Sequence, residues 1–163
     1  MPITYERIAA ATLSTASSLI TFSSIPTTYT DLKVVFDATS ANGTYPTFRF
    51  NSDSTGSYSM TYIYSSGSSA SYGILGNQSE IYPLQGLSSA VPTVVTLDIF
   101  NYRSGTNKSM WIDIVGDGYK PVGPGLWRNT SVINRIDITA LYGSSPNTFA
   151  AGTVASLYGI AAA

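Results

Sequence analysis

The sequence predicts an all-β fold, an antiparallel β-sandwich that is jelly-roll-like and has eight or nine strands. Two observations lead to this prediction. Apolar residues alternate with polar ones at period two over many short segments, and clusters of Gly, Pro, Asn and Ser separate those segments. Because the strand signals follow one another without helical segments between them, two packed sheets are the expected architecture.

Nine segments carry the strand signal, and several have a clear inner and outer face. Leu32, Val34 and Phe36 share one face of their segment and should point at the core. Residues 109–116 alternate in the same way. Two-faced strands of this kind indicate antiparallel sheets with one side in water. The candidate strands are residues 18–23, 31–38, 47–51, 58–64, 79–84, 93–102, 109–116, 132–141 and 153–160.

The remaining segments are predicted to be turns, apart from the N-terminus. Asn42-Gly43 is a hairpin signal, and the Gly/Pro-rich residues 116–125 indicate an irregular loop. Residues 5–13 have some helical propensity but lead into a Ser/Thr cluster without a cap. We expect residues 1–17 to form an N-terminal arm or a first strand, and residues 18–163 to form a single β-sandwich domain.

The composition excludes several classes of function. Charged residues make up only 10% of the chain, against roughly 25% in typical soluble domains. The sequence has no His and no Cys, so Ser-His-Asp and Cys-His catalysis and thiolate metal sites are ruled out. The 8 basic residues are scattered, which argues against nucleic-acid binding. No apolar run is long enough for a membrane span, and the N-terminus lacks a secretory pattern.

The stretch FRFNSDSTGSYS at residues 48–59 resembles part of a calcium loop, because Asn51, Asp53 and Thr55 alternate before Gly56. A complete EF-hand loop would end in a bidentate carboxylate at its twelfth position, where this chain has Tyr62. We therefore interpret the stretch as a tight hairpin connection between the strands at residues 47–51 and 58–64. The sequence predicts no metal and no cofactor.

Acidic residues are the candidates for catalysis in this sequence, and aromatic residues are the candidates for binding a partner. Asp98, Asp113 and Asp137 lie opposite the apolar positions of their strands, which indicates outward-facing charges more than the paired carboxylates of a glycosidase. Tyr119 and Trp127 lie in or beside the Gly/Pro-rich loop, where a partner contact and burial are equally open interpretations. No catalytic residue is predicted.

Three stretches resemble a known group of proteins. They are residues 18–38, which include Ile-Pro-x-x-Tyr-x-Asp-Leu, residues 48–59, and residues 149–163, which include Gly-Thr-x-x-x-Leu-Tyr-Gly-Ile. Together with the strand end Ile-Phe-Asn-Tyr at residues 99–102, they resemble small virion structural proteins of tailed bacteriophages, including cyanophages. The resemblance implies a β-sandwich of the capsid decoration or cement type, located on the capsid surface after synthesis in the host cytoplasm.

The resemblance also implies partners. The expected ones are the major capsid protein and further copies of the chain, with a homotrimer favoured because shells have local threefold points. An alternative is a phage tail or fibre domain that binds host surface glycans, and a carboxylate-based glycan hydrolase is a more distant one. The candidate partner-contact residues are Ile3, Tyr5, Ile8, Tyr119 and Trp127.

Overall fold

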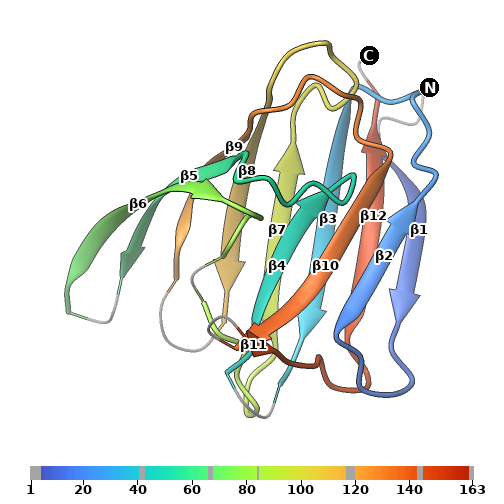
Figure 1. The fold of residues 1–163 in the computed structure, drawn as a ribbon. Helices are drawn as coiled ribbons and strands as arrows, with labels where there is room; N and C mark the ends of the chain where they lie inside the picture. The colour runs from blue at the N-terminus through green and yellow to red at the C-terminus, as the bar shows by residue number, and fades with distance from the viewer. Residues whose placement is uncertain are drawn as a thin grey trace.

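The computed structural model confirms the all-β antiparallel sandwich (Figure 1). It describes residues 5–40, 43–65, 68–83, 85–116, 120–142 and 145–161. The strands within these residues are β1 (Tyr5–Thr12), β2 (Leu19–Ser23), β3 (Asp31–Ala38), β4 (Tyr45–Phe50), β5 (Tyr58–Ser65), β6 (Ala70–Gln78), β7 (Thr93–Ile99), β8 (Lys108–Val115), β9 (Val122–Trp127), β10 (Arg135–Tyr142), β11 (Ser145–Pro146) and β12 (Val154–Ile160).

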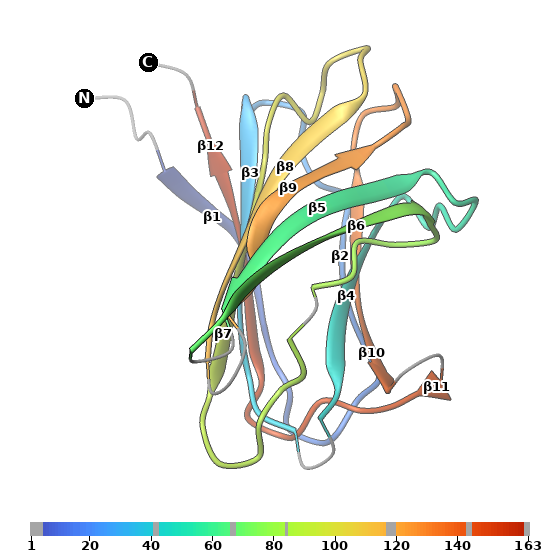
Figure 2. The same ribbon diagram turned by 90° about the vertical axis from the view of Figure 1, so that its left-hand side faces the viewer.

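The two sheets are unequal in size. The larger has 8 strands in the order β1-β12-β3-β7-β8-β9-β5-β6. In the smaller sheet β10 pairs with β2 and the short β11, and it also pairs with β4. Figure 2 shows the smaller sheet on one side of the larger one, and in Figure 1 strands β5 and β6 extend beyond it. The narrower sheet therefore leaves one end of the wider sheet uncovered.

The core lies between the two sheets and follows the period-two pattern of the sequence. Leu32, Val34 and Phe36 are fully buried, as predicted, and β8 alternates buried and exposed residues along its whole length. Phe36 meets Phe149 edge-on, with ring centroids 5.0 Å apart. Burying such alternate side chains removes apolar area from water on one face of each sheet, which favours packing of the two sheets against each other.

Several strand predictions need correction. Residues 5–13 contain strand β1 and no helix, so the first-strand interpretation holds for Tyr5–Thr12. Of the predicted strand 79–84, the described residues 79–83 form no extended strand, and Ile81 makes an isolated bridge with Phe48. The predicted irregular loop 116–125 contains the start of β9. Strand β6 has no counterpart in the sequence prediction.

The two predicted hairpins are also wrong. Strand β4 pairs with β10 in the smaller sheet, whereas β5 pairs with β6 and β9 in the larger one. Residues 51–57 therefore connect the two layers. The Asn42-Gly43 signal likewise stands between β3 and β4, which lie in different sheets, and Asn42 is outside the described residues. A turn sequence fixes the local backbone but not the sheet that the chain enters next.

Within the described residues, the chain contains no helix of the length and apolar character that crossing a membrane requires.

Candidate interaction surface on the β5–β6 hairpin

The β5–β6 hairpin carries three of the most exposed large apolar side chains in the described structure. Ile63 is 60% exposed, Tyr72 is 77% exposed and Ile74 is 72% exposed. The register pairs Ile63 with Tyr72 and Thr61 with Ile74, so all three side chains lie on one face of the hairpin, the outer face of the larger sheet. We call Ile63, Tyr72 and Ile74 the hairpin patch.

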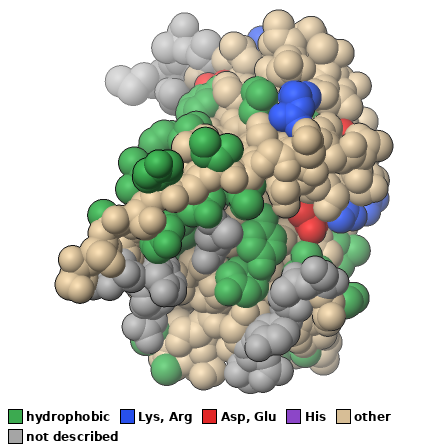
Figure 3. All heavy atoms as spheres, turned by 60° about the vertical axis from the view of Figure 1, so that its left-hand side comes forward, with side chains coloured by type: hydrophobic (Ala, Val, Ile, Leu, Met, Phe, Trp, Pro, Cys, Tyr) green, Lys and Arg blue, Asp and Glu red, His purple; other side chains and the backbone are tan. Residues whose placement is uncertain are grey.

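Apolar side chains continue from the hairpin patch onto the neighbouring strands. Val122 of β9 is paired with Ile63, and Pro124 of β9 is paired with Trp111 of β8, which is 43% exposed. Figure 3 shows hydrophobic side chains gathered along the side of the molecule that carries the hairpin, with Lys, Arg, Asp and Glu mostly elsewhere in that view. Contiguous exposed apolar surface of this kind marks interaction sites in soluble proteins.

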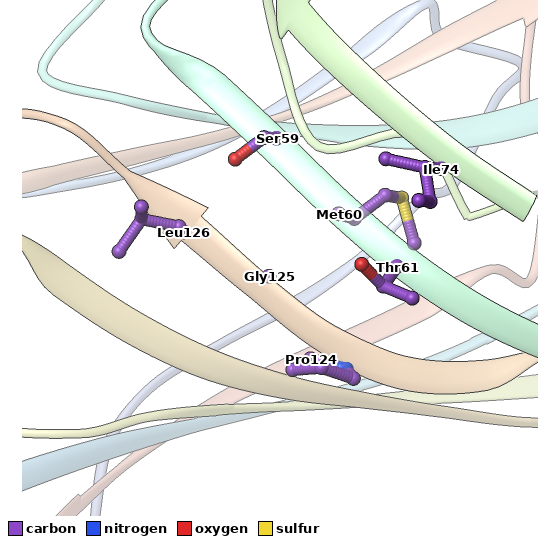
Figure 4. A pocket seen from close by; sticks show the side chains of 7 residues that line it. All are labelled: Ser59, Met60, Thr61, Ile74, Pro124, Gly125 and Leu126. Carbon is purple, nitrogen blue, oxygen red and sulfur yellow. The ribbon is translucent and has the colours of Figure 1, made fainter.

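A shallow hollow lies beside the hairpin patch (Figure 4). Its volume is about 250 Å³. The small residues Ser59 and Thr61 of β5 lie between Ile74 of β6 and the Pro124–Leu126 segment of β9. Low hydroxyl side chains between taller apolar ones produce the depression. A side chain from a partner could fit there and contact both walls.

The hairpin itself carries no formal charge. Residues 54–79 include no Asp, Glu, Lys or Arg, and along the chain the nearest acids are Asp53 and Glu80. On the outer face, the exposed Asp113 of β8 is paired with Val122 of β9, which is in turn paired with Ile63. Glu80 is nearly buried and accepts hydrogen bonds from Thr47 Oγ1 at 2.9 Å and Arg49 Nη2 at 3.1 Å. Glu80 is therefore engaged in hydrogen bonds at the base of the hairpin, and residues 54–79, which project from that base, have no charged side chain.

On the opposite face, aromatic packing stiffens the hairpin. A Cβ built on Gly73 would lie 2.1 Å from the Tyr62 hydroxyl oxygen, so the Tyr62 ring occupies the space over Gly73. Tyr62 also packs against Tyr64, with ring centroids 6.0 Å apart. An aromatic ring laid over a cross-strand glycine compensates for the missing side chain and holds the register.

Trp127 anchors the base of the hairpin. Its side chain is fully buried, stacks on Tyr58 with ring centroids 6.1 Å apart, and meets Phe50 edge-on at 5.5 Å. The indole Nε1–H donates to Asp53 Oδ2 at 2.8 Å. This contact joins the connection between the layers to β9, so the start of β5 is fixed on both sides.

The Asp53 carboxylate accepts hydrogen bonds from four nearby donors. Oδ1 accepts from the Thr55 amide and hydroxyl at 3.0 and 2.6 Å, and Oδ2 accepts from the Ser57 hydroxyl at 2.7 Å as well as from Trp127. Partial burial opposes ionisation, but these hydrogen bonds prevail and hold the pKa of Asp53 well below its usual range. The calcium-like stretch is therefore a structural tether, whose oxygens are occupied by N–H and O–H donors.

Arg128 fastens both strands of the hairpin at the same end. Its guanidinium donates to Ser59 Oγ at 3.0 Å, to the Gly56 carbonyl at 3.0 Å and to Asn77 Oδ1 at 3.3 Å. These acceptors lie before β5, within β5 and within β6. A planar guanidinium with several fixed donors suits this three-way contact.

Strand β6 is the edge of the larger sheet, since among the described strands it pairs with β5 alone. The pairing is regular from Ala70 to Leu75. It shifts between Tyr58 and Met60, where β6 has an extra residue and Asn77 has a φ of 53°. We call the backbone of residues 70–75 the free edge.

The three predicted contact residues that the structure describes, Tyr5, Ile8 and Trp127, do not form one site. Tyr5 is 47% exposed on β1 and packs on Tyr158, and Ile8 is partly buried against the core. Trp127 is a core residue, so of its two open interpretations the structure supports burial and removes it as a surface contact. Ile3 and Tyr119 lie outside the described residues. Strand β1 and the hairpin are at opposite ends of the larger sheet.

Sequence reasoning missed the hairpin patch. A signal for it was present, because a long uncharged run containing Ile63, Tyr72 and Ile74 is unusual beside strands that alternate with charged residues. The exposure of these side chains follows from the narrowness of the smaller sheet, which the sequence does not state.

Two of the three candidate acids, Asp98 and Asp113, lie on the neighbouring strands β7 and β8 of the larger sheet, and the third, Asp137, lies in the smaller sheet. Asp98 forms an ion pair with Lys33 at 2.8 Å on the outer face of the larger sheet. Asp137 is in the smaller sheet, where it pairs with Arg135 and accepts from Thr21 Oγ1 at 2.7 Å. Contrary to the expected solvated position, Asp137 is buried under these partners. Burial acts against its charged form, but the hydrogen bonds from Arg135 and Thr21 outweigh it and lower the pKa of Asp137.

Over the residues that the structure describes, no three acids, histidines or cysteines come together as a metal-binding group. No protein-family model matches the chain, and a search of curated proteins gives no match.

Proposed function

We propose that the chain is a non-enzymatic structural protein of a tailed-phage virion. In this proposal it is a capsid decoration or cement protein that binds the major capsid protein shell as a homo-oligomer and stabilises it. It acts on the capsid surface after synthesis in the host bacterial cytoplasm. The sequence resemblance in residues 18–38, 48–59 and 149–163 supports the virion assignment.

One observation carries the binding role: the hairpin patch projects from a firmly anchored base, and residues 54–79, which contain it, have no formal charge. Ile63, Tyr72 and Ile74 would be costly to leave in water unless a partner covers them. A rigid anchor means that little conformational entropy is lost on binding. A protein that must occupy many equivalent positions on a shell gains from both properties.

The threefold expectation rests on shell symmetry alone, because no residue pattern in the chain indicates it. The proposal includes a homo-oligomer without fixing the number of copies. Tyr72 favours the alternative of a tail or fibre domain, since an exposed aromatic ring can stack on a sugar.

Copy number in purified particles tests the proposal. Quantitative mass spectrometry against the major capsid protein should give hundreds of copies per particle for a decoration protein. A few tens of copies or fewer would reject decoration and favour the tail. A glycan array with the wild-type chain and the Tyr72→Ala variant separates the alternative, because specific binding that is lost in the variant would support glycan recognition.

A further inference from the structure

We infer that the free edge of β6 pairs with the same edge of a second copy of this chain, antiparallel and about a two-fold axis at Gly73. The inference rests on the oligomeric part of the proposed function and names the surface responsible. The two larger sheets would then join into one continuous sheet. The occupant of the hairpin patch would be the hairpin patch of the second copy.

The free edge lacks the features that normally prevent strand addition. An edge strand presents unpaired backbone N–H and C=O groups, and proteins usually block such edges with charges, Pro or bulges. Residues 70–75 contain neither a charged residue nor Pro, and the bulge of β6 lies beyond them at Gly76–Asn77. The free edge is therefore open to a further strand.

The register of the proposed pairing brings exposed apolar side chains opposite each other. Pairing centred on Gly73 places Tyr72 of one copy opposite Ile74 of the other, and the two-fold axis repeats this pair. Both side chains point to the outer face, where each is more than 70% exposed in the single chain. Aromatic and β-branched residues directly opposite each other stabilise antiparallel strands. The most exposed apolar side chains of the hairpin would thus cover one another.

The absence of charge on the free edge favours a second copy over a different protein. A two-fold contact brings identical groups near each other, so any charge on the edge would face its own kind. Residues 54–79 have no formal charge, and the adjacent Asp53 and Glu80 are engaged at the base. The edge therefore meets its copy without electrostatic repulsion.

Two other sheet edges do not compete. Strand β1 carries Glu6 and Arg7 and has a register shift between Arg7 and Ala9. Strand β2, at the edge of the smaller sheet, is only 5 residues long, and Thr21 on it is hydrogen-bonded to Asp137. Short length, charge and bulges are the usual means of protecting edges.

The first experiment measures self-association of the full chain by sedimentation velocity over a range of concentrations. We expect a concentration-dependent dimer in the wild type. The Ile74→Lys variant should raise the dimer dissociation constant at least about tenfold, because both Tyr–Ile pairs are lost and two like charges approach. Val115→Lys is the matched control, since Val115 is 61% exposed on the same outer face but lies on β8.

Both substitutions are at exposed positions, and thermal unfolding should show that each variant retains the fold. A monomer at all concentrations, a trimer, or a dimer weakened equally by Val115→Lys would overturn the inference. So would a chain that is monomeric alone and binds shells through β6, because this would show that an extended segment of the shell protein occupies the edge.

The second experiment tests the register by disulfide formation. The chain has no Cys, so introduced thiols are the only ones present. The single variants Tyr72→Cys and Ile74→Cys are prepared separately and oxidised alone and as a mixture. A pairing centred on Gly73 brings the thiol of the first variant opposite the thiol of the second within disulfide distance, so the mixture should cross-link efficiently and each variant alone poorly. Equal cross-linking in all three samples would reject the register.

The two proposals can fail independently. Absence of the dimer together with hundreds of copies per particle would reject self-pairing and leave the decoration role. A dimer with the expected register and only a few copies per particle would do the opposite.

Discussion

The two edges of the larger sheet, β1 and β6, differ in charge and in where the bulge interrupts the strand. Strand β1 has Glu6 and Arg7 near its start and a bulge at Ile8, and it lies beside the core-packed β12. The free edge of β6 has no charge over six regular residues and projects beyond the smaller sheet. One edge of the same sheet is blocked and the other is open.

This difference agrees with the self-pairing inferred for the open edge. An unprotected apolar edge strand promotes aggregation in a soluble protein, and it can be tolerated where a defined partner covers it. The anchoring at the base of the hairpin fits this interpretation. Trp127, Asp53 and Arg128 fix the start of the hairpin, so the edge is presented in one orientation. Substitutions at the base of the hairpin and on β1 test this difference between the two edges.

The largest effect is expected from Trp127→Ala. Removing this fully buried side chain leaves a cavity between Phe50 and Tyr58, and we expect the free energy of unfolding to fall by about 3–5 kcal/mol. Tyr5→Ala on the other edge is the counterpart, where loss of the exposed pair with Tyr158 should cost about 1 kcal/mol. Urea denaturation measures both. Equal losses would contradict a specially anchored β6 side.

The sequence predicted well those strands that have one buried and one wet face. Asp31–Ala38 is a strand with the bounds expected, and residues 109–116 differ from β8 by one residue at each end. In both, the period-two signal reflects burial by the opposite sheet. In these two strands the alternation of the sequence and the alternation of burial coincide.

Two strands of the larger sheet, β6 and β9, were missed for different reasons. Most of β6 is exposed on both faces, so its sequence has no alternation to detect. Strand β9 contains Gly123, Pro124 and Gly125, which indicate a loop. A Cβ on Gly123 would lie 2.0 Å from the Thr61 carbonyl oxygen, so glycine is required there by the close approach of β5. The interaction surface depends on these two strands, and for that reason the sequence alone did not locate it.

An intermediate effect is expected from Asp53→Asn. The amide would turn an N–H₂ group toward the donors of Ser57 and Trp127 or of Thr55, leaving at least one of them unpaired, at a cost of about 2 kcal/mol at neutral pH. Asp113→Asn is the matched control, because it makes the same change at an exposed position and should alter stability by less than about 0.5 kcal/mol.

The same variant should change the response to acid. Because the pKa of Asp53 is lowered in the folded chain, its contribution to stability is complete above its ordinary pKa of 3.8 and is lost as the pH falls below that value. Asp137 acts with the same sign. Urea midpoints between pH 6 and pH 2, which are set experimentally, should fall for the wild type and fall less steeply for Asp53→Asn. Parallel curves would show that Asp53 does not carry the effect.

The smallest effect is expected from removing the charges of β1. The double variant Glu6→Thr/Arg7→Thr leaves the net charge at −1, since one acid and one base are lost together. Its stability should change by about 1 kcal/mol or less, because both side chains are exposed. The bulge between Arg7 and Ala9 remains and interrupts the register that an added strand would need. We therefore expect sedimentation velocity to give the wild-type dissociation constant within about threefold. A new oligomer that persists when Ile74→Lys is added would mean that charge alone blocks the β1 edge, and the contrast between the two edges would then come from two residues.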